Sequence, residues 1–268
     1  MKKYLSIFKV KMMNNIQYRM AAIAGISTQL FFGLVFIMVY LAFYKSGNNS
    51  NLPMNWQELV SYLWLNQILF AMVYIWQKDR DLLSMIKDGN ISYELCRPIN
   101  FYKKWYATMY GSRLSAVLLR FLPVTIIAFL LPEPLKLYPP ISIESFILFL
   151  LSLIISSLLV TAISLLIHVI TMFIIDERGL MTMMMVTGEI FSGGTIPLSF
   201  YPHFLQKIAY ILPFRYIVDI PFRIYSGNIS ISNAIPDLIN GLIWLIVLLR
   251  VGYILSHKAT KKAILQGG

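Results

Sequence analysis

Long stretches without a charged side chain constrain the fold of this chain more than any other feature. Residues 25–44 and 145–175 contain no Lys, Arg, Asp or Glu, and short clusters of Lys and Arg separate such stretches. A bilayer core about 30 Å thick is crossed by roughly 20 apolar residues in a helix. The sequence therefore predicts an all-α, polytopic membrane protein.

The composition supports the same class. Hydrophobic residues make up 58% of the chain, charged residues 13%, and the mean hydropathy is +0.68, whereas a soluble domain is about half apolar and a quarter charged. The net charge of +11 comes from basic residues at the ends of apolar runs, which favours lipid headgroups over nucleic acid as the partner. The single cysteine, Cys96, excludes an intrachain disulfide.

The uncharged runs predict six spans in one domain, residues 1–268. We place them near residues 21–44, 58–77, 106–131, 143–174, 180–198 and 236–256. The first is too long for a signal-peptide core and lacks an A-x-A site, so we expect it to stay in the mature protein. Lys and Arg concentrate in the N-terminal segment, the second connection and the C-terminal tail. The positive-inside rule then predicts a multi-pass protein of the cell membrane with both termini in the cytoplasm.

Two segments outside the spans are predicted to be helices. In residues 1–20, Tyr4, Leu5, Phe8 and Met12 form an apolar side, with Lys11 near it, so we expect a helix lying along the inner membrane surface. The second helix lies in the cytoplasmic loop 78–104.

The loop helix has clear end signals. Asp79 and Asp81 suit its start, Lys87 its last turn, and Gly89 its left-handed close. Its apolar side is formed by Leu82, Leu83, Met85 and Ile86. We expect this side to be uncovered within the chain. Two roles follow for it: lying flat on the membrane, or docking into a soluble partner.

Residues 188–228 are apolar but interrupted by Pro197, Pro202, Pro213 and Pro221. Prolines at these intervals prevent one continuous span, and the apolar content disfavours a solvated loop. Residues 192–228 therefore predict two short helices that re-enter the outer leaflet. Candidate path or gate residues in and before this segment are Glu189, Ser192, Gly193, Gly194 and Pro197.

Charged and titratable residues within the spans each allow two interpretations. Glu189 either binds a cationic substrate or pairs with an arginine across a subunit interface. Arg113 and Arg120, seven residues apart on one helical face, either snorkel and pack or form a charged site on a transport route. His168 is either an interfacial hydrogen-bonding group or a proton relay.

The order of these parts resembles the permease subunits of ABC-2 type exporters. The matching residues are Lys87-Asp88-Gly89-Asn90-Ile91, Leu95-Cys96-Arg97-Pro98-Ile99, Ser192-Gly193, Ile196-Pro197-Leu198, Pro202, Leu212-Pro213-Phe214 and Gln266-Gly267-Gly268. The resemblance covers nearly the whole chain and implies an interfacial helix, six spans, a coupling helix and two re-entrant helices.

The resemblance also implies a function and its partners. It implies an ATP-driven exporter in which this chain forms half of the substrate path beside a second permease, either itself or a related chain. Two ABC ATPase subunits would carry ATP and Mg, and this chain would bind no cofactor. No G-x-x-x-x-G-K-[ST] loop occurs in it, so it is not expected to be an enzyme. The expected docking residues are Asp81, Leu82, Leu83, Ser84, Met85, Ile86, Lys87, Asp88 and Gly89.

Two other classes are weaker interpretations. An ATP-independent channel or ion-coupled carrier usually shows internal repeats or several intramembrane charges, and this sequence shows neither. An intramembrane protease would use Ser192 with His168 or His203. The predicted topology places these two histidines near opposite membrane surfaces.

Overall fold

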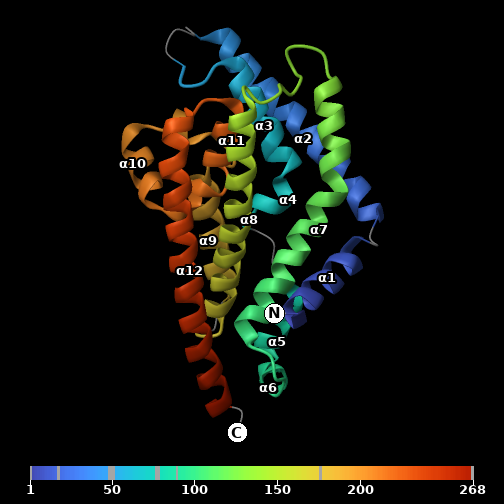
Figure 1. Ribbon diagram of the computed structural model, residues 1–268, viewed down its shortest axis with the longest axis vertical. Coiled ribbons are helices and arrows are strands. Elements are labelled where there is room, and N and C mark those ends of the chain that lie inside the picture. The colour runs from blue at the N-terminus through green and yellow to red at the C-terminus, as the bar shows by residue number, and fades with distance from the viewer. Residues whose placement is uncertain are drawn as a thin grey trace.

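The computed structural model describes residues 2–16, 19–47, 52–75, 79–88, 90–174 and 177–266, and every regular element within these ranges is helical. The α-helices are α1 (Lys2–Ile16), α2 (Arg19–Ser46), α3 (Trp56–Ile68), α4 (Phe70–Val73), α5 (Arg80–Lys87), α6 (Ile91–Leu95), α7 (Phe101–Leu130), α8 (Ile143–Thr171), α9 (Glu177–Ser192), α10 (His203–Ile211), α11 (Asp219–Ser226) and α12 (Ile231–Gln266). Two 3₁₀ helices are η2 (Leu198–Phe200) and η3 (Pro213–Tyr216). The predicted all-α class is confirmed for this part of the chain (Figure 1).

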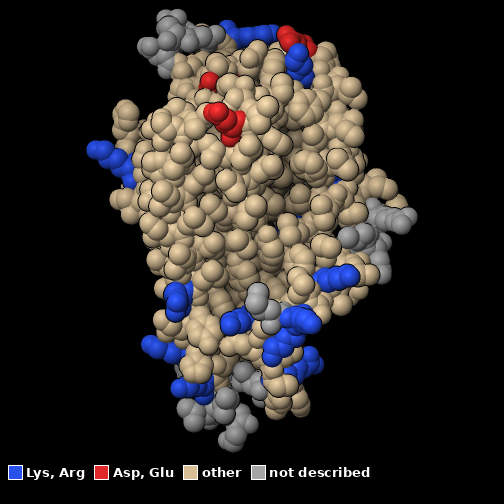
Figure 2. Space-filling view, viewed as in Figure 1, with Lys and Arg blue, Asp and Glu red and all other residues tan. Residues whose placement is uncertain are grey.

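Within the described ranges, four helices have the length and hydropathy needed to cross a membrane. They comprise residues Ala22–Ser46, Phe101–Leu130, Ile143–Thr171 and Ile231–Lys261. Their outward faces expose large apolar side chains, among them Phe31, Leu122, Ile147 and Ile246. Figure 2 shows a broad band without charged side chains between a lower end rich in Lys and Arg and the upper end. This surface suits lipid, and the chain is a multi-pass membrane protein.

The structure shortens two of the six predicted spans. In the range 58–77, α3 ends at Ile68, and after Leu69 only the four-residue α4 follows in the described part of this range. In the range 180–198, α9 ends before Gly193, whose φ of 83° is left-handed and stops the helix. Among the described residues, four helices rather than six therefore meet the criteria for a membrane-crossing helix.

The α3 helix lies inside the bundle. All ten residues from Leu59 to Ile68 are buried, and the helix contacts α2, α7 and α11. It begins at Asn55, whose side chain accepts a hydrogen bond from Glu58 N while the Glu58 carboxylate accepts one from Asn55 N. Because α3 is buried on all sides, its polar side chains face other protein segments rather than lipid.

The segment between α9 and α12 forms the predicted pair of short helices, α10 and α11, together with η2 and η3. Prolines mark the starts of these elements: Pro197 precedes η2, Pro202 precedes α10, and Pro213 is the first residue of η3. Figure 1 shows these elements in the upper half of the molecule. Their position relative to the outer leaflet stays a prediction.

The lower end of the molecule in Figure 1 carries α5, α6, the start of α1 and the end of α12. The α1 helix lies obliquely across α7, and the Phe8 ring stacks on Tyr110 at 5.8 Å. A Cβ atom on Gly111 would lie 2.9 Å from Phe8 O, so glycine allows the two helices to approach closely. The predicted N-terminal helix exists, and its placement on the membrane surface remains a prediction.

Candidate functional site

The α5 helix forms where the sequence predicts it. The Asp79 side chain accepts a hydrogen bond from Leu82 N at 3.0 Å and caps the first turn. Lys87 lies in the last turn. Gly89, the predicted closing residue, lies outside the described residues.

The apolar side of α5 is covered by the protein itself, and the expectation that it is uncovered was wrong. Leu82 is 1% exposed and Leu83 8%. Leu82, with the half-buried Met85 and Ile86, packs on a cluster of side chains from α7, α8 and α12. These covering side chains are Phe101, Tyr102, Trp105, Met109, Leu165, Val169 and Ala259. Their positions are distant from residue 82 in the sequence, so a local pattern cannot reveal the cover.

The exposed side of α5 is polar. It presents Arg80, Asp81, Ser84, Lys87 and Asp88. The Asp81 carboxylate lies 3.5 Å from the Lys11 ammonium of α1. A partner that meets α5 from outside the bundle therefore contacts charged and hydroxyl groups rather than the leucine side.

His168 connects α8 to the start of α5. Its Nε2 accepts a hydrogen bond from Asp79 N at 3.2 Å, and its Nδ1 lies 2.6 Å from Ser164 O. Because Nε2 accepts, the neutral ring carries its proton on Nδ1 and donates it to the Ser164 carbonyl. The side chain is 2% exposed. The position favours the hydrogen-bonding interpretation of this histidine.

Arg113 of α7 donates hydrogen bonds to backbone carbonyls inside the bundle. The guanidinium donates to Met72 O at 3.3 Å, to Tyr74 O and to the Ser164 hydroxyl. These carbonyls end α4, where the last turn of a helix leaves acceptors without helical donors. Arg113 is 1% exposed, so it does not snorkel to a membrane surface.

Arg120, the second predicted intramembrane charge, lies at the contact between α7 and α2. A Cβ atom on Gly25 would lie 2.3 Å from its guanidinium carbon. The two arginines lie on one face of α7 but contact different helices. The structure brings Arg113 to Met72, Tyr74 and Ser164, whereas Arg120 lies against Gly25 of α2.

Tyr74 joins Arg113 to Glu189. Its carbonyl accepts from Arg113, while its hydroxyl donates to Glu189 Oε1 at 3.0 Å. Thr195 donates to the same carboxylate oxygen at 2.8 Å. Asp79, His168, Ser164, Arg113, Tyr74 and Glu189 thus form one connected set, which we call the polar chain. It runs from the start of α5 to Glu189 in the last turn of α9.

The loop after α9 is fixed to α3 by its backbone. The Tyr62 hydroxyl donates to Gly193 O at 2.8 Å, and the Asn66 amide donates to Gly194 O. A Cβ atom on Gly193 would lie 2.7 Å from the Tyr62 hydroxyl, so the left-handed glycine also permits this close contact.

Four side chains hold the other end of the loop; we call Glu58, Asp219, Arg223 and Asn228 the outer clamp. Asp219, which is 0% exposed, accepts from Leu198 N and from Arg223, each at 3.2 Å. Arg223 donates to Asn228 at 2.7 Å, and Asn228 donates to Glu58 at 2.9 Å. The clamp links the loop after α9 to the first turn of α3.

The predicted path or gate residues lie together but leave little open space. Glu189, Ser192 and Gly194 border a cavity of about 10 Å³, roughly the volume that one water molecule requires. Ser192 is buried and donates to Glu189 O at 3.3 Å, and Pro197 is also buried. In this conformation of a single chain the group is a packed junction rather than an open route.

Sequence reasoning missed Tyr74, Ser164 and the outer clamp. Asp219 and Arg223 had a detectable signal, because opposite charges four residues apart in an apolar segment indicate a helical ion pair. Tyr74 and Ser164 had none, since their roles depend on contacts with segments 39 and 51 residues away in the chain.

Comparison with known proteins agrees with this architecture. The family described as ABC-2 family transporter protein matches residues 30–265, which include all four long helices except the first residues of α2 and the last of α12. No curated protein matches the chain. Members of this family are membrane components that work with an ABC ATPase. The chain therefore belongs to the ABC-2 transporter family and is a membrane-embedded permease of an ABC transporter.

Proposed function

We propose that this permease works in an ATP-driven exporter and receives the motion of its ATPase through α5. Two permeases, either two copies of this chain or this chain and a related one, would enclose the substrate path and bind two ATPase subunits carrying ATP and Mg. Both termini and α5 would face the cytoplasm, where the excess of Lys and Arg at that end agrees with the positive-inside rule. With α3–α4 and α9 as the shorter crossings, the chain would cross the membrane six times.

One observation carries this proposal: the N-cap residue of α5, Asp79, is joined to the interior of the bundle by a hydrogen bond from its backbone N–H to His168. A displacement of α5 pulls on the Asp79–His168 bond and therefore on the end of α8. Ser164, one turn earlier in α8, bonds Arg113, so the displacement reaches Tyr74 and Glu189 through buried groups. A buried polar group that loses its hydrogen-bond partner costs roughly 1 to 3 kcal/mol of stability. Breaking any one bond of the polar chain is therefore unfavourable, and its members should move together.

The apolar cover under α5 supports the same role. Leu82 anchors the helix to α7 and α8 while the polar side stays exposed. The inner side of α5 packs on the bundle, and its outer side is exposed and can bind an ATPase. Displacement of α5 toward or away from the bundle would therefore move the helices on which it packs.

The test separates the two sides of α5. The variant Arg80→Glu/Ser84→Trp/Asp88→Lys changes only exposed positions, and we expect it to lose ATPase co-purification while keeping its thermal unfolding temperature. The variant Lys258→Glu, at an exposed site near the C-terminal end of α12, is the matched control and should retain the ATPase. Transport that persists after ATP depletion would instead favour the ATP-independent carrier.

A further inference from the structure

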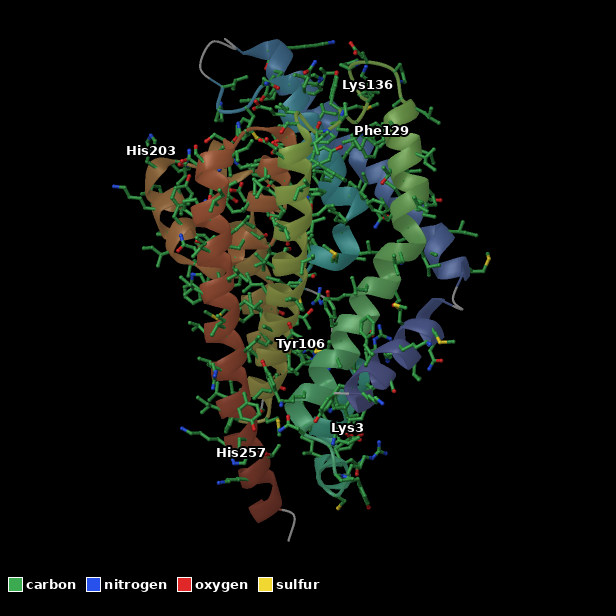
Figure 3. All side chains as sticks on the ribbon, in the orientation of Figure 1. Lys3, Tyr106, Phe129, Lys136, His203 and His257 are labelled. Atoms are coloured by element: carbon green, nitrogen blue, oxygen red, sulfur yellow. The ribbon has the colours of Figure 1, made fainter. Side chains whose placement is uncertain are left out.

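A large groove opens between α1, α7 and α12 in the lower half of the molecule. Its volume is about 920 Å³, within the range of sites that enclose small organic ligands. Figure 3 shows Tyr106 between α7 and the helices α8 and α12, beside this groove. Residues that line it include Leu5, Phe8, Tyr106, Ala107, Leu249 and Tyr253. The walls are mainly apolar and aromatic.

Three basic side chains line the groove. Lys2 comes from α1, Lys103 from α7 and Arg250 from α12, and all three are exposed. Within the described ranges no carboxylate forms an ion pair with any of them. By contrast, Lys11 and Lys104, nearby on α1 and α7, are paired with Asp81 and Glu94. An apolar groove with unpaired cations suits an amphipathic anion.

A buried polar atom gives a second, independent indication of a ligand. Tyr102 also lines the groove and is 5% exposed, yet its hydroxyl has no hydrogen-bond partner among the described residues. The neighbouring tyrosines are partnered: Tyr106 donates to Leu158 O at 2.8 Å, and Tyr4 accepts from Asn100 N at 3.3 Å. A buried hydroxyl without a partner costs about 1 to 3 kcal/mol, and a rotation of the Tyr102 ring toward the groove would let a ligand acceptor remove that cost.

We propose that this groove binds one anionic glycerophospholipid. An acyl chain lies along Leu5, Phe8 and Leu249, and the phosphate lies among the three cations. After a rotation of its ring toward the groove, the Tyr102 hydroxyl donates to an ester carbonyl of the lipid. Tyrosine rings with an apolar body and a polar tip are typical of the membrane interface, where the two parts of a lipid meet.

The lipid site has a structural consequence for α1. The groove separates α1 from α12, and a lipid within it contacts both helices as well as α7. It therefore joins the N-terminal helix to the last span at the end of the molecule that carries α5. The leaflet to which the lipid belongs rests on the proposed orientation, whereas the site itself does not depend on the ATPase.

The experiment measures lipid binding to the permease alone, without an ATPase, by native mass spectrometry in detergent. We expect phosphatidylglycerol to remain bound and phosphatidylcholine to be lost at the same concentration. In Lys2→Gln/Lys103→Gln/Arg250→Gln, retention of phosphatidylglycerol should weaken roughly 100-fold, at the usual contribution of one basic residue near an anionic lipid. Ala107→Trp, which fills the groove without changing charge, should also abolish retention.

The matched control removes the same charge from the same end of the molecule. Lys9→Gln/Lys258→Gln/Lys261→Gln changes exposed cations outside the groove and should bind phosphatidylglycerol as the unchanged protein does. Inorganic phosphate at equal concentration should not compete. Equal loss in the control variant, equal retention of phosphatidylcholine, or full binding by Ala107→Trp would each overturn the proposal. None of these outcomes bears on docking at α5.

Discussion

The two ends of the bundle differ in how they are held together. At the upper end, the outer clamp and the Tyr62 and Asn66 bonds fix the loop after α9 against α3, and the cavity there is about 10 Å³. At the lower end, a small separate apolar cluster supports α5, and a groove of about 920 Å³ separates α1 from α12. A closed hydrogen-bond network resists displacement, whereas elements with few shared contacts move at lower free energy.

This difference suggests where motion enters and where it is resisted. Force applied at α5 acts on the end that contains the groove and reaches the other end through the polar chain as well as through the packing of Leu82 on α7 and α8. The account therefore predicts large losses of stability from changes in the outer clamp. Changes at the lower end of the polar chain should mainly affect coupling.

The largest expected effect is from Asp219→Asn. The change removes the fully buried carboxylate and leaves Arg223, whose side chain is 14% exposed, without its ionic partner. Removing one partner of a buried ion pair costs roughly 3 to 5 kcal/mol. Thermal unfolding in detergent should show a clear drop in Tm. Asp237→Asn is the matched control, because its partner Arg215 pairs at the same 3.2 Å but Asp237 is 18% exposed. Equal losses in the two variants would contradict a special role for the clamp.

Arg113→Met should rank next. It leaves Met72 O and Tyr74 O without their donor, and each unsatisfied buried carbonyl costs about 1 to 3 kcal/mol. Arg113→Lys should recover only part of the loss, because an ammonium cannot reproduce the guanidinium fork. Unfolding temperatures of the two variants check this order, and an unchanged Tm in Arg113→Met would count against the polar chain.

Gly193→Ala tests the loop after α9 directly. The left-handed backbone and the 2.7 Å approach of the Tyr62 hydroxyl predict a loss of about 1 to 3 kcal/mol. Gly194→Ala is the neighbouring control, since its Cβ atom would meet nothing closer than 3.4 Å. If both variants unfold at the same temperature, the loop is not held as tightly as described.

His168→Phe comes last: it removes the hydrogen bonds of the ring to Asp79 N and Ser164 O, at a net cost of about 1 kcal/mol each. It removes the acceptor for Asp79 N, so ATP hydrolysis by the complex should continue while transport per ATP falls. Glutamine at this position keeps an amide oxygen and should restore part of the transport. Full transport by His168→Phe would show that coupling does not require the hydrogen bond between Asp79 and His168.

Local features of the fold were predictable from the sequence. The start of α5 follows from Asp79. The glycines after Ser192 are a local signal for the end of α9, but the predicted span 180–198 ran past them. The predicted spans 106–131 and 143–174 correspond closely to α7 and α8, because a long, mainly apolar run determines its own helix. The prolines likewise predicted short helices after η2.

Long-range contacts were not predictable. The break at Leu69 falls in an apolar run with no glycine or proline, so nothing local indicates it. The burial of Leu82 depends on side chains from three other helices. The bond between Asn228 and Glu58 spans 170 residues. Such features follow from packing of distant segments, which a single sequence does not encode as a local pattern.

Cross-linking from α5 tests the central claim most directly. In a Cys96→Ser background, which removes the exposed native thiol, Ser84→Cys carries a photoactivatable maleimide on the polar side of α5. Ser232→Cys, exposed near the start of α12 at the opposite end, is the control. The account predicts that Ser84, and not Ser232, cross-links to a polypeptide whose peptides contain a G-x-x-x-x-G-K-[ST] loop. ATPase adducts from Ser232 with none from Ser84 would contradict it.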